Sequence, residues 1–380
     1  MSSSGHIQKS LGQYLRVLPV KGFEKTVEDI CRYIENSLDL NAAKETLLSK
    51  VQEITGNNYC PLMEYPHHLL LPEMRADEAV KAILLSELEI IELVESGLIQ
   101  NIDTEFLHDF RVAIRRTRSI LKQIKGVFYK RIIDRYNTTF SWLGKLTGPL
   151  RDTHVYLLKL EYYQQQLSEE TRSHLEPLRA FLLKHEILEH KNLVRELAKK
   201  RYSNIKSSWR EFLTQPVFKK TLLPNADKNI KQVSDAAIWD AYKKVIASGS
   251  KIKNDSADEK LHRMRIKCKK LRYLLEFFGD LYPKKQMSVI LESLKKLQGM
   301  LGDFQDVSVQ TTRLRIFETQ MEEEGMLTAE TLEAMESLVS CLNNIKEDIR
   351  KLYMKNYAVL TGKKIKSKFS KLFNTVSEMP

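Results

Sequence analysis

Cysteine, glycine and proline are scarce in this sequence of 380 residues, and it has no long hydrophobic run. The four cysteines lie far apart without metal-ligand spacing, which argues against a disulfide framework or a zinc site. No apolar run reaches the roughly 18 residues of a membrane span, and the start MSSSGHIQKS lacks the apolar core of a signal peptide. We therefore expect a soluble protein of the cytoplasm.

The rest of the amino-acid composition is rich in helix-forming residues. Long stretches place apolar side chains three and four positions apart, as amphipathic helices do, and few windows alternate as strands do. We expect an all-α protein whose helices, about 20 to 40 residues each, are long enough to form bundles. Lysine and arginine outnumber aspartate and glutamate by 61 to 49, giving a formal charge of +12 that favours an anionic partner.

The sequence contains an internal repeat. LHDFRVAIRR (107–116) returns as LHRMRIKCKK (261–270), an offset of 154 residues. The same offset aligns LTGPLRDTHV (146–155) with MLGDFQDVSV (300–309), so the match runs without a gap over about 50 residues. We expect a duplication of two four-helix units, 75–215 and 216–380, packed as bundles about a pseudo-twofold axis. Residues 1–74 would form a short helical extension.

Each repeat carries a stripe of cations beside an apolar stripe. In the first, Leu107, Phe110 and Ile114 follow the spacing of a buried helix face. The cations follow the same spacing shifted by one residue, about 100° around the helix, so they flank the core. They are His108, Arg111, Arg115, Arg118 and Lys122 in the first repeat and His262, Arg265, Lys269 and Arg272 in the second.

These stripes favour an anionic ligand over a merely solvated face. Like charges one turn apart cost a few tenths of a kcal/mol per pair, and few acidic residues are placed to offset them. A groove between the repeats would bring the two stripes to one anion. Weaker candidates for the same groove are Arg116, Lys122, Lys270, Lys206 and Lys366.

Two Gly-x-x-x-Asp segments stand at matching positions. Gly148 and Gly302 would permit a kink or close helix contact, and Pro149 would remove one backbone hydrogen bond. Asp152 and Asp306 are expected to accept hydrogen bonds from the stripe arginines and fix their rotamers, rather than to bind a metal or act in catalysis.

These segments resemble the CHAD family, the conserved histidine α-helical domain, over about residues 75–375. The resemblance rests on LHDFRVAIRRTRSIL, LGKLTGPLRDTHV, LHRMRIKCKKLRYLLEFF and LKKLQGMLGDFQDV. It implies two four-helix bundles with a basic furrow that binds inorganic polyphosphate, at polyphosphate granules, without catalysis, metal or cofactor. The phosphate contacts it implies are His108, Arg111, Arg115, Arg118, His262, Arg265, Lys269 and Arg272.

Two other functions are weighed against this one. A nucleic-acid-binding protein would suit the charge, but no zinc finger, RRM-type motif or recognition helix is recognisable. A phosphohydrolase or phosphotransfer enzyme could use His108 and His262 as metal ligands or phosphoryl acceptors. However, Arg111 and Arg265 occupy the i+3 positions, where a second metal ligand would be expected. The barrel domain that precedes CHAD in some relatives is not recognisable either.

Overall fold

The computed structural model describes residues 24–38, 69–253 and 255–374, and the chain divides into two compact units, Met1–Tyr65 and Pro66–Pro380. In the first unit, the described residues form helix α1 (Glu24–Ser37). The remainder of the expected extension up to residue 68 lies outside the described residues. The second unit contains both predicted repeats in one compact body, and it includes Leu70, which is buried in the core.

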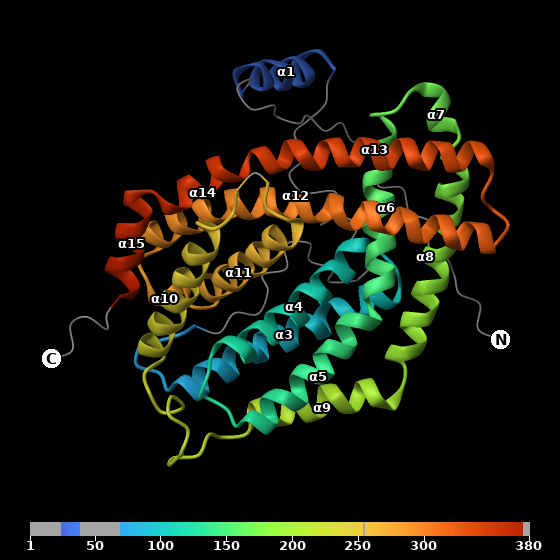
Figure 1. The fold of residues 1–380 in the computed structure, drawn as a ribbon. Coiled ribbons are helices and arrows are strands. Elements are labelled where there is room, and N and C mark those ends of the chain that lie inside the picture. Colours follow the sequence, from blue (N-terminus) through green and yellow to red (C-terminus); the bar gives the residue numbers. More distant parts are fainter. Residues whose placement is uncertain (1–23, 39–68, 254, 375–380) are drawn as a thin grey trace. The chain divides into compact units, whose positions relative to one another are not determined.

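The prediction of an all-α fold is confirmed, since the described residues contain no strand (Figure 1). The first repeat forms α3 (Ala76–Ile99), α4 (Thr104–Gln123), α5 (Lys130–Leu146), α6 (Gly148–Gln164), α7 (Glu169–Ser173), α8 (Glu176–Leu197) and α9 (Lys200–Thr214). The second forms α10 (Ile230–Gly249), α11 (Asp258–Phe277), the 3-10 helix η1 (Gly279–Leu281), α12 (Lys284–Glu323), α13 (Ala329–Lys351), α14 (Tyr353–Thr361) and α15 (Lys363–Phe373).

The helices follow the 154-residue offset of the sequence repeat. Helices α3 and α10 begin 154 residues apart, as do α5 and α12, and α4 and α11 match at both ends. The two repeats also meet through reciprocal hydrogen bonds. Ala76 N donates to Lys228 O at 2.9 Å, and its counterpart Ile230 N donates to Met74 O at 2.8 Å. Between these bonds, Arg75 and Asn229 form an isolated antiparallel bridge, so a local twofold axis relates the two repeats here.

The third helix differs between the repeats. In the first repeat it is divided at Thr147 into α5 and α6, and Pro149 stands in the first turn of α6. Proline cannot donate the backbone hydrogen bond that a continuous helix requires. Asp303 takes this position in the second repeat, and α12 continues unbroken through Gly302 over 40 residues. The kink expected at the glycine is therefore found only in the repeat that carries the proline.

Two hydrophobic cores hold the second unit together. The larger one takes residues from both repeats and includes Leu107, Phe110 and Ile114, the predicted buried face of α4. The smaller core joins α6 and α8 of the first repeat to α13 and the C-terminal part of α12. Because this core takes two helices from each repeat, the prediction of two separate four-helix bundles is not confirmed.

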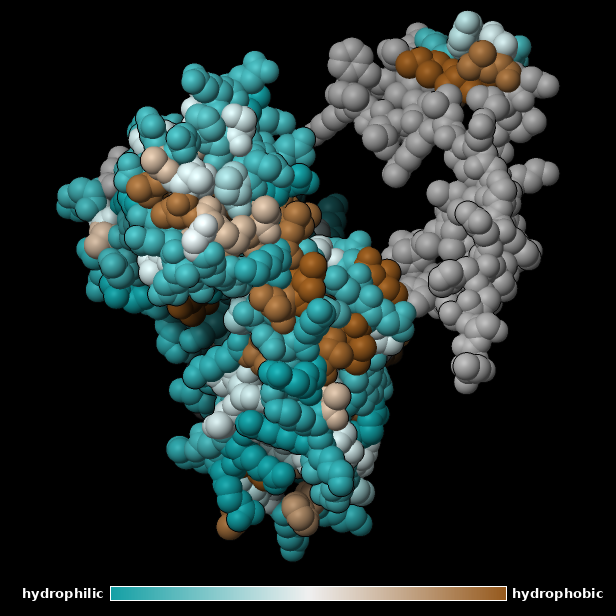
Figure 2. Space-filling model, turned by 90° about the vertical axis from the view of Figure 1, so that its right-hand side faces the viewer, coloured by the Kyte–Doolittle hydropathy of each residue, from teal (hydrophilic) through white to brown (hydrophobic). Residues whose placement is uncertain are grey.

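The surface of the second unit is mostly hydrophilic on the face shown in Figure 2, with hydrophobic patches across its middle. Exposed large hydrophobic side chains include Leu183, Ile187 and Leu188 on α8. Among the described helices, none combines the length and the hydrophobicity that a membrane crossing requires.

The surroundings of two glycines predict opposite effects of adding a methyl group. A Cβ at Gly249 would lie 2.1 Å from the Tyr357 ring, whereas a Cβ at Gly302 would meet nothing within 4 Å. We expect Gly249→Ala to destabilise the protein by about 1–3 kcal/mol through overpacking. Gly302→Ala should stabilise it by about 0.5–1 kcal/mol, since alanine is the better helix former. Denaturant unfolding measures both, and a destabilised Gly302→Ala protein would mean that this glycine is structurally required.

Candidate anion-binding surface

The two cationic stripes lie on neighbouring antiparallel helices. Arg116 on α4 contacts Glu276 on α11 at 3.1 Å, and Gln123 Nε2 donates to Lys270 O at 3.3 Å. Since the later residue of α4 meets the earlier residue of α11, the helices run in opposite directions side by side (Figure 1). Leu107 and Leu261 face the core, while Arg111 and Arg265 beside them are half-buried, as the sequence pattern predicts.

The stripes approach each other closely enough to repel. Burial, together with the charges of Arg265, Arg115 and Arg272, lowers the pKa of Lys269 to about 7. The pKa of Arg265 is also lowered, by burial and by Arg115 across the boundary between the repeats. Arg115 and Lys269 are counterparts in the 154-residue offset, so this crowded group lies where the two stripes converge. Such a cluster of half-buried cations favours an anionic ligand.

The stripe arginines have few acceptors within the protein. Arg111 Nη1 donates to Gly144 O at 2.9 Å and to Thr147 Oγ1 at 2.6 Å, which fixes its guanidinium at the end of α5. Burial and the charge of Arg115 lower the pKa of Arg111 to about 10. Among the described residues of the two stripes, a buried Nε without a hydrogen-bond acceptor is found in Arg115, Arg118 and Arg265, whereas Nε of Arg272 lies 3.1 Å from Glu276 Oε1. Buried guanidinium groups ordinarily hydrogen-bond to something, so these donors are available to a ligand.

The two stripe histidines make equivalent contacts with different partners. Arg151 Nη2 donates to His108 Nδ1 at 2.9 Å, and at the matching position His262 Nδ1 pairs with Gln305 Oε1. Because a guanidinium can only donate, Nδ1 of His108 accepts, and the neutral ring carries its hydrogen on Nε2. Burial and the charge of Arg151 lower the pKa of His108, which favours this neutral form. His108 can therefore donate one hydrogen bond from Nε2 without carrying a charge.

The two aspartates pair across the repeats rather than with the stripes. Asp152 on α6 forms an ion pair with Arg313 on α12. In the reciprocal pair, Asp306 on α12 contacts Lys159 on α6 at 3.2 Å. The direct hydrogen bonds expected from the stripe arginines are not among their contacts. Instead, the charge of Asp152 partly opposes the lowering of the Arg111 pKa. The charge of Asp306 partly opposes the lowering of the pKa of Arg265 and of Lys269.

The head of the first stripe also contains potential metal ligands. Ligand atoms of Glu105, His108 and Asp109 lie within 4.8 Å of one another. The sequence pattern did not indicate this group, because Glu105 stands three residues before His108 rather than after it. The guanidinium of Arg151 occupies Nδ1 of the same histidine. A fixed positive charge there repels a cation and attracts an anion, so the arrangement suits phosphate better than metal.

Several weaker candidates lie at the end of a stripe or away from the stripes. Arg116 pairs with Glu87 at 2.6 Å and with Glu276, so its charge is neutralised within the protein. Lys206 pairs with Glu95 at 2.5 Å on the side where α9 packs against α3. Lys366 is exposed on α15, which packs against α10 and α12. Lys122 and Lys270 line a separate pocket at the end of α4.

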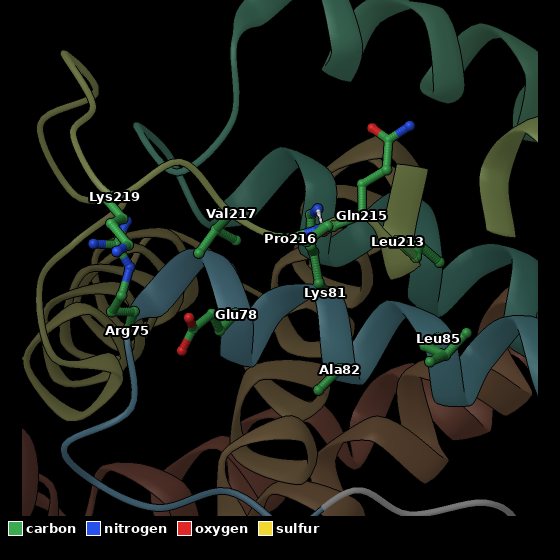
Figure 3. A pocket seen from close by; sticks show the side chains of 10 residues that line it. All are labelled: Arg75, Glu78, Lys81, Ala82, Leu85, Leu213, Gln215, Pro216, Val217 and Lys219. Carbon is green, nitrogen blue, oxygen red and sulfur yellow. Dashed lines mark hydrogen bonds between the residues drawn. The ribbon is translucent and has the colours of Figure 1, made fainter. Parts of the chain in front are cut away.

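A further pocket of about 620 Å³ lies between the start of α3 and the end of α9 (Figure 3). Two of its three cations, Arg75, Lys81 and Lys219, already have partners. Arg75 pairs with Asp77 at 2.7 Å, and Lys81 Nζ donates to Gln215 O at 2.6 Å. The side chain of Glu78 adds a negative charge to the lining. This pocket therefore offers an anion less than the stripes do.

Comparison with known proteins identifies the family and the fold of this chain. The family model described as CHAD domain matches residues 82–315. The structure is similar to the crystal structure of the CHAD domain from the plant Ricinus communis, with a TM-score of 0.65, 25% identity, and coverage of 79% of this chain and 98% of that one. It also resembles PptA from Streptomyces chartreusis in fold, with a TM-score of 0.59, 11% identity, and coverage of 75% and 99%. No curated protein matches the chain.

The histidine contacts predict how one substitution changes a titration. Arg151→Gln reproduces the partner found in the second repeat and removes a positive charge beside His108. We expect the pKa of His108 to rise toward the ordinary histidine value of about 6.5, without reaching it while burial persists. Histidine ring resonances followed by NMR against pH measure this, with His262 as the internal control. An unchanged His108 titration would mean that Arg151 does not govern its charge.

Proposed function

The chain belongs to the CHAD family, and we propose that it binds inorganic polyphosphate along the stripes of α4 and α11 without catalysing a reaction. The observation that supports this most strongly is the group formed by Arg115, Arg265 and Lys269. These cations come from both repeats, the charge of Arg115 lowers the pKa of Arg265 and of Lys269, and the buried Nε atoms of both arginines have no acceptor. A line of phosphates would relieve the repulsion and supply the acceptors in one step.

The chemistry of the stripes suits a polymer without sequence information. Polyphosphate presents closely spaced charges and no bases, so a row of guanidinium and ammonium groups is sufficient to hold it. Binding to single-stranded nucleic acid typically adds aromatic rings on which bases stack. The side chains of the two stripes are arginine, lysine and histidine, and His108 is held neutral by its surroundings, as a hydrogen-bond donor to phosphate.

The assignment predicts a large loss of affinity when the central pair is neutralised. Arg115→Gln with Lys269→Gln removes one cation from each repeat at equivalent positions. We expect affinity for long-chain polyphosphate to fall at least about tenfold, and the slope of log affinity against log salt to become shallower by about one to two units. Titration at two salt concentrations measures both quantities.

Lys284→Gln with Lys285→Gln provides the matched control, because these exposed lysines at the start of α12 carry the same total charge. The control should retain most of the affinity. An equal loss in both proteins would show that net charge, rather than the stripes, drives binding.

A product gel of polyphosphate incubated with the protein and Mg²⁺ is run in parallel. Shortening of the polyphosphate chain would contradict the non-catalytic role. Oligonucleotides that displace polyphosphate at equal phosphate concentration would favour a nucleic-acid function instead.

Lys269 predicts a pH dependence of this affinity. Its pKa of about 7 in the free protein means that it is only partly charged near neutral pH. A bound polyanion favours the charged form, so the complex holds more protons than the free protein above pH 7. Affinity should therefore decrease as the pH rises from about 7 toward the ordinary lysine value of about 10.4. Lys269→Arg, which stays charged, should flatten this decrease, and an equally steep decrease in that variant would exclude Lys269 as its source.

A further inference from the structure

A pocket lined by lysines lies on the opposite flank of α11 from the stripe residues Arg265 and Lys269. This lysine pocket has a volume of about 240 Å³ and is bounded by the end of α4, by α10 and by α11. Its charged lining residues are Lys122, Lys125, Asp240, Lys244, Lys267 and Lys270. Five positive side chains therefore face one negative side chain.

Only part of this charge is balanced within the protein. Lys244 forms an ion pair with Asp240, and Lys267 donates to Ser248 Oγ. For Lys122, Lys125 and Lys270, no ion pair is found within the part of the chain that the structure describes. Three ammonium groups thus share one pocket without a carboxylate of their own.

The first repeat shows how the equivalent place is neutralised. The offset of 154 residues aligns Lys270 with Arg116, Ala241 with Glu87 and Lys122 with Glu276. In the first repeat, Arg116 lies between the two carboxylates, 2.6 Å from Glu87 and 3.1 Å from Glu276. In the lysine pocket, an alanine and a second lysine stand where those carboxylates would be. The positive charge is kept, and both of its internal counter-charges are gone.

The same alignment explains why the second repeat has a cavity here. Ala237 and Ala241 line the lysine pocket, and their counterparts Ile83 and Glu87 are both buried in the first repeat. The smaller side chains open the space beside Lys270. Cavity and unbalanced charge therefore arise from the same substitutions between the repeats.

We propose that the lysine pocket is a second anion site, separate from the group of Arg115, Arg265 and Lys269, which takes a short oligophosphate whose oxygens replace the two missing carboxylates. The volume lies below the roughly 300–1,000 Å³ of sites for larger organic ligands. The lining has no aromatic ring on which a base could stack, which disfavours a nucleotide. Two or three linked phosphates carry enough charge to match three ammonium groups. The ligand is either free oligophosphate or a segment of a longer chain.

The test is a calorimetric titration of sodium triphosphate at constant ionic strength. The full chain carrying Arg115→Gln and Lys269→Gln is the starting protein, so that the stripes contribute little. Into it we introduce Ala241→Glu, which restores the carboxylate of the first repeat without removing a lysine. We expect triphosphate affinity to fall at least about tenfold. Ala236→Glu, an exposed position on the same helix with the same change of charge, should leave it unchanged.

Unreduced triphosphate binding by a folded Ala241→Glu protein would overturn the proposal, and so would absence of binding in the starting protein. Should circular dichroism show that Ala241→Glu is unfolded, Lys125→Gln with Lys270→Gln replaces it, with the same loss expected. Ala241→Glu in the otherwise unaltered chain distinguishes the two sources. Weakened long-chain binding there assigns the pocket to a polymer segment, and unchanged long-chain binding assigns it to free oligophosphate. Failure of the stripe proposal would appear separately, as undiminished long-chain binding by the starting protein.

Discussion

The repulsion among Arg115, Arg265 and Lys269 is the constraint on which the rest of the surface depends. The fold places α4 and α11 side by side and antiparallel, so equivalent cations of the two repeats converge. Burial makes this convergence costly, as the pKa of about 7 for Lys269 shows. Clusters of this kind are typical of functional sites, and under the proposed function a bound polyanion offsets the cost.

Several neighbouring contacts make this arrangement tolerable. The reciprocal pairs Asp152–Arg313 and Asp306–Lys159 link α6 to α12, and their carboxylates stabilise the charged stripes through space. Arg111 is fixed by acceptors at the break between α5 and α6. These contacts fix Arg111 and favour the charged forms of the stripe cations without neutralising them.

The sequence predicted the helices and the stripes well because both follow from local spacing. The 154-residue offset gave the starts of α10, α11 and α12, and the apolar face of α4 is buried as expected. Contacts between helices that lie far apart in the sequence could not be predicted from local spacing. The roles of Arg151, Lys159 and Arg313 depend on the meeting of α6 with α4 and α12, and the neutralisation of Arg116 depends on Glu276 of the other repeat. The smaller core, shared by two helices of each repeat, was also unforeseen because periodicity does not identify partners.

Differences between the repeats give the duplicated fold two unlike halves. Pro149 divides one helix that its counterpart keeps whole, Arg151 stands where the other repeat has Gln305, and Ala241 opens a pocket that Glu87 fills. Both repeats retain the cationic stripes.

A crystal structure of the protein with bound long-chain polyphosphate tests most directly whether the stripes bind the polymer. The account predicts phosphate oxygens within hydrogen-bond distance of Arg115, Arg265 and Lys269 together. A chain bound along α9 or α15, with these three side chains untouched, would contradict it.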